Sequence, residues 1–256
     1  MPLKVEQLFY YPVKSFSGVA SRALELTRRG PVWDREWMLV DADGTFLSQR
    51  TLPRMALVKT ALEDDALYIV LPDTDLLRIS VATDGKPLRR VVVWDDAGDA
   101  FDEGDRAADA LSAFLGQPCR LMRFIPGFKR RHDTAFADGY PLLVTTMESL
   151  ADLGRRAGTA FEMERFRPNI VVSGEPAWSE DGWTGLAADR LRIRPVKPCA
   201  RCAITTVDPG TAATGPEPLK TLASFRRGAD GGVLFGVNCA PESEGRLKVG
   251  DVLISA

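Results

Sequence analysis

Cysteine, histidine and long apolar runs are all scarce in this chain. Its 256 residues include 4 cysteines and 1 histidine. Four thiols are too few for a disulfide scaffold at this length, so free thiols in a reducing cytoplasm are the simplest expectation. No apolar run approaches the ~20 residues that a membrane-spanning helix needs. The first residues, 1–6, lack the features of a secretory signal or a transit peptide. We therefore expect a cytoplasmic protein without a membrane partner.

An excess of charge of one sign is also missing. The 33 Lys and Arg residues nearly balance 35 Asp and Glu residues, which leaves a formal net charge of −2. No global field therefore attracts nucleic acid or an anionic membrane. Hydrophobic residues make up 45% of the chain and charged residues 27%, as in ordinary globular proteins. The length allows one large domain or two small ones.

Short strand patterns dominate the chain, and the expected fold is mainly β with some α (α+β). In the first hundred residues, apolar and β-branched segments alternate with turn residues, which is typical of a barrel or sandwich. Apolar residues recur at helical spacing over 107–115, with Gly116 as a C-cap. A second helix is expected from Thr145, with Glu148 three residues on as in a capping box, and a third over 218–225. Further strands are expected at 169–173, 191–195, 203–207, 233–238 and 252–255.

The most informative motif is a pair of thiols three residues apart, Cys199 and Cys202, ahead of the expected strand 203–207. Thiolates select soft metals, clusters or redox chemistry. No second CxxC or nearby Cys/His cluster completes a tetrahedral zinc site. A metal here would take most of its ligands from elsewhere, which points to a metal carried by an organic cofactor. The residues alone leave other interpretations open: buried structural thiols, a redox couple without the thioredoxin-like context, or a two-thiolate zinc module. Cys119 and Cys239 are expected to be core thiols.

Six separated sequence blocks resemble segments of one protein family, and they occur in the same order as in that family. They are residues 10–15, 34–40, 166–172, 199–202 with 205–209, 217–222, and 249–251. Together they resemble the MOSC-domain proteins with an N-terminal MOSC β-barrel, a group that includes the mitochondrial amidoxime reducing component and the bacterial YcbX proteins. The resemblance implies an N-terminal MOSC β-barrel domain over 1–122 and a MOSC β-barrel domain over 123–256. The boundary is soft, and we expect a cofactor in the cleft between the two parts.

The resemblance implies an enzyme that uses the molybdenum cofactor (Mo-molybdopterin). Cys202 would be its metal ligand and catalytic residue, and Cys199 would tune the site or only pack. The implied cofactor contacts are Lys14, Ser15, Arg35, Arg167 and Asn169, with Arg50 as a further candidate. Guanidinium groups bind phosphate bidentately and lysine meets it as a point charge, so these residue types suit a pterin that ends in a phosphate.

The implied reaction is the reduction of N-hydroxylated compounds, such as hydroxylamines, amidoximes or N-hydroxylated bases, to amines or imines. The chain ends at Ala256 without the ferredoxin domain of some bacterial relatives. We therefore expect electrons from a separate ferredoxin, flavodoxin or cytochrome. The alternative function is a sulfur-carrier or cofactor-handling MOSC protein with a cysteine persulfide. The basic run 129–131 is expected to be a solvated loop or a docking point for an acidic electron-transfer partner. Position does not support a general-acid role for His132.

Overall fold

The computed structural model describes residues 1–72 and 76–256, and it confirms a mainly β protein with few helices. The strands are β1 (Pro2–Tyr10), β2 (Val19–Ser21), β3 (Ala23–Thr27), β4 (Gly30–Pro31), β5 (Trp37–Val40), β6 (Lys59–Glu63), β7 (Ala66–Val70), β8 (Leu77–Ser80), β9 (Leu88–Val93), β10 (Asp96–Asp102), β11 (Arg120–Arg123), β12 (Leu142–Thr146), β13 (Ile170–Ser173), β14 (Leu186–Ala188), β15 (Leu191–Arg201), β16 (Val233–Pro241), β17 (Gly245–Lys248) and β18 (Val252–Ser255). The α-helices are α1 (Asp105–Leu115), α2 (Met147–Ala157) and α3 (Leu219–Ala223), and 3₁₀ helices cover Pro53–Leu57, Met163–Phe166, Ser179–Gly182 and Ala203–Thr206. None of the helices in the described ranges has the length and apolarity to cross a bilayer.

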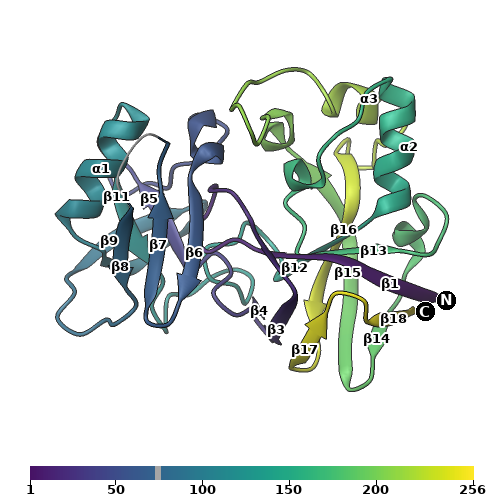
Figure 1. Cartoon of the computed structure of the whole chain (residues 1–256), viewed down its shortest axis with the longest axis horizontal. Helices are drawn as coiled ribbons and strands as arrows, with labels where there is room; N and C mark the ends of the chain where they lie inside the picture. The colour runs from purple at the N-terminus through teal and green to yellow at the C-terminus, as the bar shows by residue number, and fades with distance from the viewer. Residues whose placement is uncertain (73–75) are drawn as a thin grey trace.

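Seven strands close into a barrel, seen on the right of Figure 1. Their order is β13-β12-β16-β15-β14-β18-β1, and β1 pairs back with β13, which removes the free edges. Only the β12–β13 pair is parallel among these neighbours. A parallel pair needs a crossover connection, and α2 lies in that connection. Alternate residues such as Leu3 and Val5 of β1 point into a common core with Val172 and Leu253.

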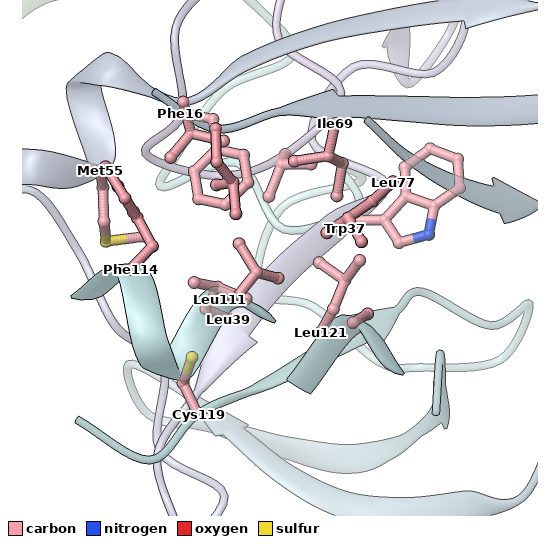
Figure 2. Packing of buried hydrophobic residues seen from close by; sticks show 14 of the residues in the cluster. Phe16, Trp37, Leu39, Met55, Ile69, Leu77, Leu111, Phe114, Cys119 and Leu121 are labelled. Atoms are coloured by element: carbon pink, nitrogen blue, oxygen red, sulfur yellow. The ribbon is translucent and has the colours of Figure 1, made fainter. Parts of the chain in front are cut away.

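A second core lies under α1, on the left of Figure 1. It fills the space between helix α1, the four-stranded sheet β5-β11-β10-β9 and the three-stranded sheet β6-β7-β8. Figure 2 shows Leu111 and Phe114 of α1 in this cluster together with Trp37 and Ile69. The spacing of Leu111 and Phe114 predicts this buried face, and the structure confirms it. Gly116 caps the helix with φ 75°, a conformation that glycine adopts without steric cost.

Strand pairing joins segments from the two ends of the chain. β1 is part of the barrel formed otherwise by later strands, and β3 pairs with β17 in a three-stranded sheet with β4. Both termini consequently lie beside each other, next to β1 and β18 (Figure 1). The division of the chain at residue 122 stays a prediction.

The N-cap of helix α2 lies one residue later than the capping box predicts, and the helix covers Met147–Ala157. Its N-cap is Thr146, whose hydroxyl accepts a hydrogen bond from the backbone N–H of Ser149 at 3.1 Å. Thr145 is still part of β12, and Glu148 accepts from the backbone N–H of Gly174 at 2.8 Å rather than closing a capping box. The predicted capping box is wrong because the strand continues through Thr146, so this is the first residue free to cap the helix.

Candidate functional site

The cysteine pair lies where β15 ends. Cys199 is within the strand, and Cys202 precedes the 3₁₀ helix Ala203–Thr206 as its N-cap. The predicted strand at 203–207 is therefore wrong. The hydroxyls of Thr205 and Thr206 donate to the carbonyls of Cys202 and Ala203 at 3.0 and 2.8 Å, so local bonds replace a strand ladder.

Strand β15 is also longer than the predicted segment 191–195. It continues to Arg201 although it contains Pro195 and Pro198. The pairing with β16 shifts register at both prolines, and such bulges accommodate residues that lack a ladder donor. The extension includes Cys199 and ends directly before Cys202.

The two thiols have different surroundings. Cys202 is exposed and Cys199 is half-buried. The sulfur of Cys202 lies 3.5 Å from Nη1 of Arg50, and that of Cys199 lies 2.9 Å from Nη1 of Arg201. Each sulfur thus has a guanidinium donor beside it, and Cys202 is the more exposed of the two residues. Cys119 and Cys239 are buried, at 3% and 0% exposure, as predicted for core thiols.

A cavity of about 170 Å³ lies beside the cysteine pair, and both halves of the chain line it. The first half contributes Lys14, Ser15 and Arg35. The second half contributes, among others, Asp138, Arg167, Asn169, Cys199, Arg201 and Cys202. The structure therefore brings six of the seven residues singled out in the sequence to one cavity, and Arg50 reaches it through its contact with Cys202.

Lys14 is buried in the cavity wall, where it pairs with the carboxylate of Asp138. Its Nζ also donates to the carbonyl of Phe136 at 2.9 Å. Burial lowers the pKa of Lys14, and Asp138 opposes that shift. Burial raises the pKa of Asp138, but the Lys14 ammonium and its hydrogen bond outweigh this and hold that pKa well below its usual range. Asp138 is therefore ionised at neutral pH and anchors Lys14.

Asp34 fixes Arg35 within a buried hydrogen-bond network. The Asp34 carboxylate pairs with the Arg35 guanidinium and accepts hydrogen bonds from the Tyr11 backbone N–H at 2.8 Å and from Nδ2 of Asn169 at 3.2 Å. Oδ1 of Asn169 accepts from the backbone N–H of Leu143 at 3.1 Å. Asn169 therefore ties the arginine segment to the barrel. Asp34 is buried and Arg35 is partly buried, so this pair differs from the weak exposed pairs common at protein surfaces.

Arg167 places a second guanidinium close to that of Arg35. Its Nη1 donates to the carbonyl of Phe16 at 2.5 Å, and Nη2 of Arg35 donates to the Arg167 carbonyl at 3.4 Å. Burial, together with the nearby Arg35 charge, lowers the pKa of Arg167 to about 10. Two positive groups therefore share one wall of the cavity, which favours an anion there.

Arg50 contacts both the Trp94 ring and Cys202. Its Cζ lies 4.6 Å from the centre of the Trp94 ring, and its Nη1 lies 3.9 Å from Oδ2 of Asp138. The Trp94 indole N–H donates to Oδ1 of Asp138 at 2.9 Å. Asp138 thus connects Lys14, Arg50 and Trp94 beside the exposed thiol.

Two buried donors leave capacity for an additional anionic group. Nη2 of Arg50 and Nε of Arg201 have no hydrogen-bond partner in the part of the chain that the structure describes. Buried donors without partners cost free energy until water or a ligand satisfies them. Within residues 1–72 and 76–256, no three His, Cys, Asp or Glu side chains gather closely enough to hold a metal ion. A metal on Cys202 thus needs ligands from another molecule, and the residues fit a metal on an anionic organic cofactor.

Two residues of the site were missed in the sequence. Arg201 lies between the cysteines and appears in the motif only as a spacer, although it contacts Cys199. Asp138 lies in a turn-like segment, and its partner Lys14 is 124 residues away in the chain. Local sequence carries a weak signal for the first residue and none for the second.

The basic segment behaves differently from a uniformly solvated loop. Arg130 is turned inward: its Nη1 lies 3.0 Å from Oδ2 of Asp96, and its Nη2 donates to the carbonyl of Ala137 at 2.7 Å. That part of the expectation is wrong. The rings of His132 and Tyr140 are tilted by 33° to each other, with centres 4.6 Å apart. Burial and neighbouring cations lower the pKa of His132.

Known proteins resemble this chain over nearly its whole length. Residues 2–118 match the MOSC N-terminal beta barrel domain, and residues 131–254 match the MOSC domain. The mitochondrial amidoxime-reducing component 1 of Mus musculus is 34% identical over 273 residues, which cover 96% of this chain and 80% of that protein. The mitochondrial amidoxime reducing component 2 of Bos taurus is 33% identical, with 96% and 81% coverage. The crystal structure of the YUAD protein from Bacillus subtilis aligns over 99% of this chain and 94% of its own, with 15% identity and a TM-score of 0.46.

Proposed function

The chain belongs to the MOSC-domain proteins with an N-terminal MOSC β-barrel, and from this we propose that it is a molybdenum-cofactor-dependent oxidoreductase. The observation that carries the proposal is the exposed Cys202 thiol beside a cavity lined by the cationic side chains of Lys14, Arg35 and Arg167. When bound, the cofactor would supply the two-electron chemistry that removes oxygen from an N–O bond.

The residues of the cavity divide into a sulfur ligand and a cationic wall. Cys202 would hold the metal through its sulfur, since thiolate is the ligand that soft metals select. Lys14, Arg35, Arg167 and Arg50 would bind the anionic part of the cofactor. Ser15 and Asn169 would complete the wall, Ser15 with φ 66° and with its carbonyl bonded to Nε2 of Gln49 at 2.8 Å.

The proposed substrates are N-hydroxylated compounds, in line with the amidoxime-reducing names of the relatives. The N–O bond breaks, two electrons and two protons are consumed, and the products are an amine or imine and water. Because its pKa is held low, Asp138 is a poor proton donor at neutral pH. We therefore assign Asp138 the role of orienting Lys14. The protons would come from water that enters the cavity.

The electron donor and location remain predictions from the sequence. We propose a separate redox protein of the ferredoxin, flavodoxin or cytochrome type as donor, and a cytoplasmic location. The relatives are named as mitochondrial. Reduction by each donor class and cell fractionation would test these two points.

Elemental analysis of Cys202→Ala against Cys199→Ala tests the proposal. Both variants are produced in cells that make the cofactor, and benzamidoxime reduction is followed with an artificial reductant. We expect near-stoichiometric molybdenum in the natural chain, loss of activity in Cys202→Ala with an unchanged circular dichroism spectrum, and a milder effect of Cys199→Ala. Full activity of Cys202→Ala would reject Cys202 as the ligand. Absence of molybdenum with labile sulfur on Cys202 would instead support the sulfur-carrier function.

A further inference from the structure

Tyr11 contacts both arginines of the cavity wall. Its side chain is fully buried, at 0% exposure. The guanidinium carbon of Arg35 lies 4.1 Å from the centre of the Tyr11 ring, and that of Arg167 lies 4.3 Å from it. We propose that Tyr11 is a positioning residue that holds these two arginines together as one anion-binding clamp. This inference rests on the proposed function, because the anion that the clamp would hold is the phosphate group of the cofactor.

Hydrogen bonds connect Tyr11 to both segments that carry the arginines. Its backbone N–H donates to Oδ1 of Asp34 at 2.8 Å, and its carbonyl accepts from the backbone N–H of Arg35 at 2.7 Å. Its hydroxyl donates to the carbonyl of Pro168 at 3.0 Å, across 157 residues of sequence. One residue therefore links the segment before β5 with the segment before β13.

The two guanidinium groups lie close to the same ring, so an anion bound there would be attracted by both positive charges. Arg35 and Arg167 have φ angles of 53° and 55°, a left-handed conformation that costs energy for residues other than glycine and persists only when surroundings enforce it. The face of an aromatic ring attracts cations, so the Tyr11 ring offsets part of the repulsion between the guanidinium groups. An anion that arrives finds both donors already placed and does not have to order them.

The ring and the hydroxyl of Tyr11 can be perturbed separately. Phenylalanine keeps the ring face and loses the bond to Pro168, while leucine loses both. Gly18 gives a third perturbation, since a Cβ there would lie 2.6 Å from Cε1 of Tyr11. Gly18→Ala therefore displaces the ring without changing either arginine.

Phosphate binding to the cofactor-free chain of 256 residues tests the clamp. Inorganic phosphate is titrated by calorimetry, and thermal unfolding is measured in parallel. We expect the dissociation constant to rise about tenfold or more in Tyr11→Leu, several-fold in Gly18→Ala and less than about threefold in Tyr11→Phe. Tyr68→Leu, in β7 outside the cavity lining, is the matched control and should bind phosphate as the natural chain does. If the variants only lost thermal stability, their dissociation constants for phosphate should not rise in this order.

Three results would overturn the proposal: no phosphate binding by the natural chain, unchanged binding by Tyr11→Leu, or equal weakening in Tyr68→Leu. If Tyr11→Leu does not fold, the test rests on Gly18→Ala. Phosphate binding by Gly18→Ala as tight as that of the natural chain would then refute the clamp. The measurement uses neither metal nor turnover. If the protein binds molybdenum through Cys202 but the variants bind phosphate as the natural chain does, only the clamp is refuted. If the variants bind phosphate more weakly but the protein never contains molybdenum, only the proposed redox function is refuted.

Discussion

Replacing Gly236 of β16 with alanine tests how tightly the barrel is packed behind the cavity. Gly236 has φ 72°, and a Cβ there would lie 2.7 Å from Cγ2 of Thr145 and 2.8 Å from the carbonyl oxygen of Val144. Both neighbours belong to β12, which pairs with β16. Asn238, two residues further along β16, lines the cavity. A shift of β12 against β16 would therefore disturb the cavity wall as well as the barrel.

The expected loss of stability has two parts. An alanine in the left-handed conformation costs about 1 kcal/mol. The overlap with a backbone carbonyl forces two paired strands apart, and such overpacking costs about 1–3 kcal/mol. Gly236→Ala should therefore lower the free energy of unfolding by about 2–4 kcal/mol. Gly85 has φ 73° with nothing within 4 Å of a Cβ, so Gly85→Ala should cost only about 1 kcal/mol.

Urea denaturation followed by tryptophan fluorescence measures this difference. Trp37 reports on the core under α1, and Trp183 on the barrel core. Because the two glycines share nearly the same φ, the comparison isolates the steric part. Equal destabilisation of Gly236→Ala and Gly85→Ala, within about 0.5 kcal/mol, would refute the packing argument.

Two further predictions concern the charges and thiols of the site. The folded-state pKa of Asp138 lies below its usual range, so its contribution to stability is complete above about pH 4 and is lost as the pH falls further. Asp138→Asn should therefore make the melting temperature depend less on pH in the acid range. It should also lower the free energy of unfolding by about 1–2 kcal/mol at neutral pH, a value reduced because Asp138 is half-exposed. An unchanged dependence of the melting temperature on acid pH would contradict the pairing with Lys14. In the cofactor-free chain, iodoacetamide should modify the exposed Cys202 first and spare Cys119 and Cys239, since burial raises the pKa of both thiols. Peptide mass spectrometry over time checks this order, and equally fast labelling of Cys239 would show that the barrel core is open.

Tertiary pairing decided several features that local pattern mispredicts. Residues 203–207 are β-branched and resemble a strand, but the threonine hydroxyls bond to local carbonyls and close a 3₁₀ turn. Thr145 carries the predicted cap, yet β12 continues through Thr146, and Thr146 caps the helix instead. Both errors have the same cause: the local pattern does not show where a strand ends, because pairing with distant segments sets the ends of β12 and β15.

The sequence by itself determined the composition class, the amphipathic face of α1 through Leu111 and Phe114, and the family, because these depend on the identity and spacing of nearby residues. It also singled out Cys202 and the cationic residues that surround it. Only the tertiary structure decided that β1 closes a barrel of later strands, that Asp138 pairs with Lys14, and that Tyr11 contacts Arg35 and Arg167 together. Apart from the Tyr11–Arg35 contact, these contacts join residues more than a hundred positions apart, and their energies depend on how far the folded chain removes the partners from water.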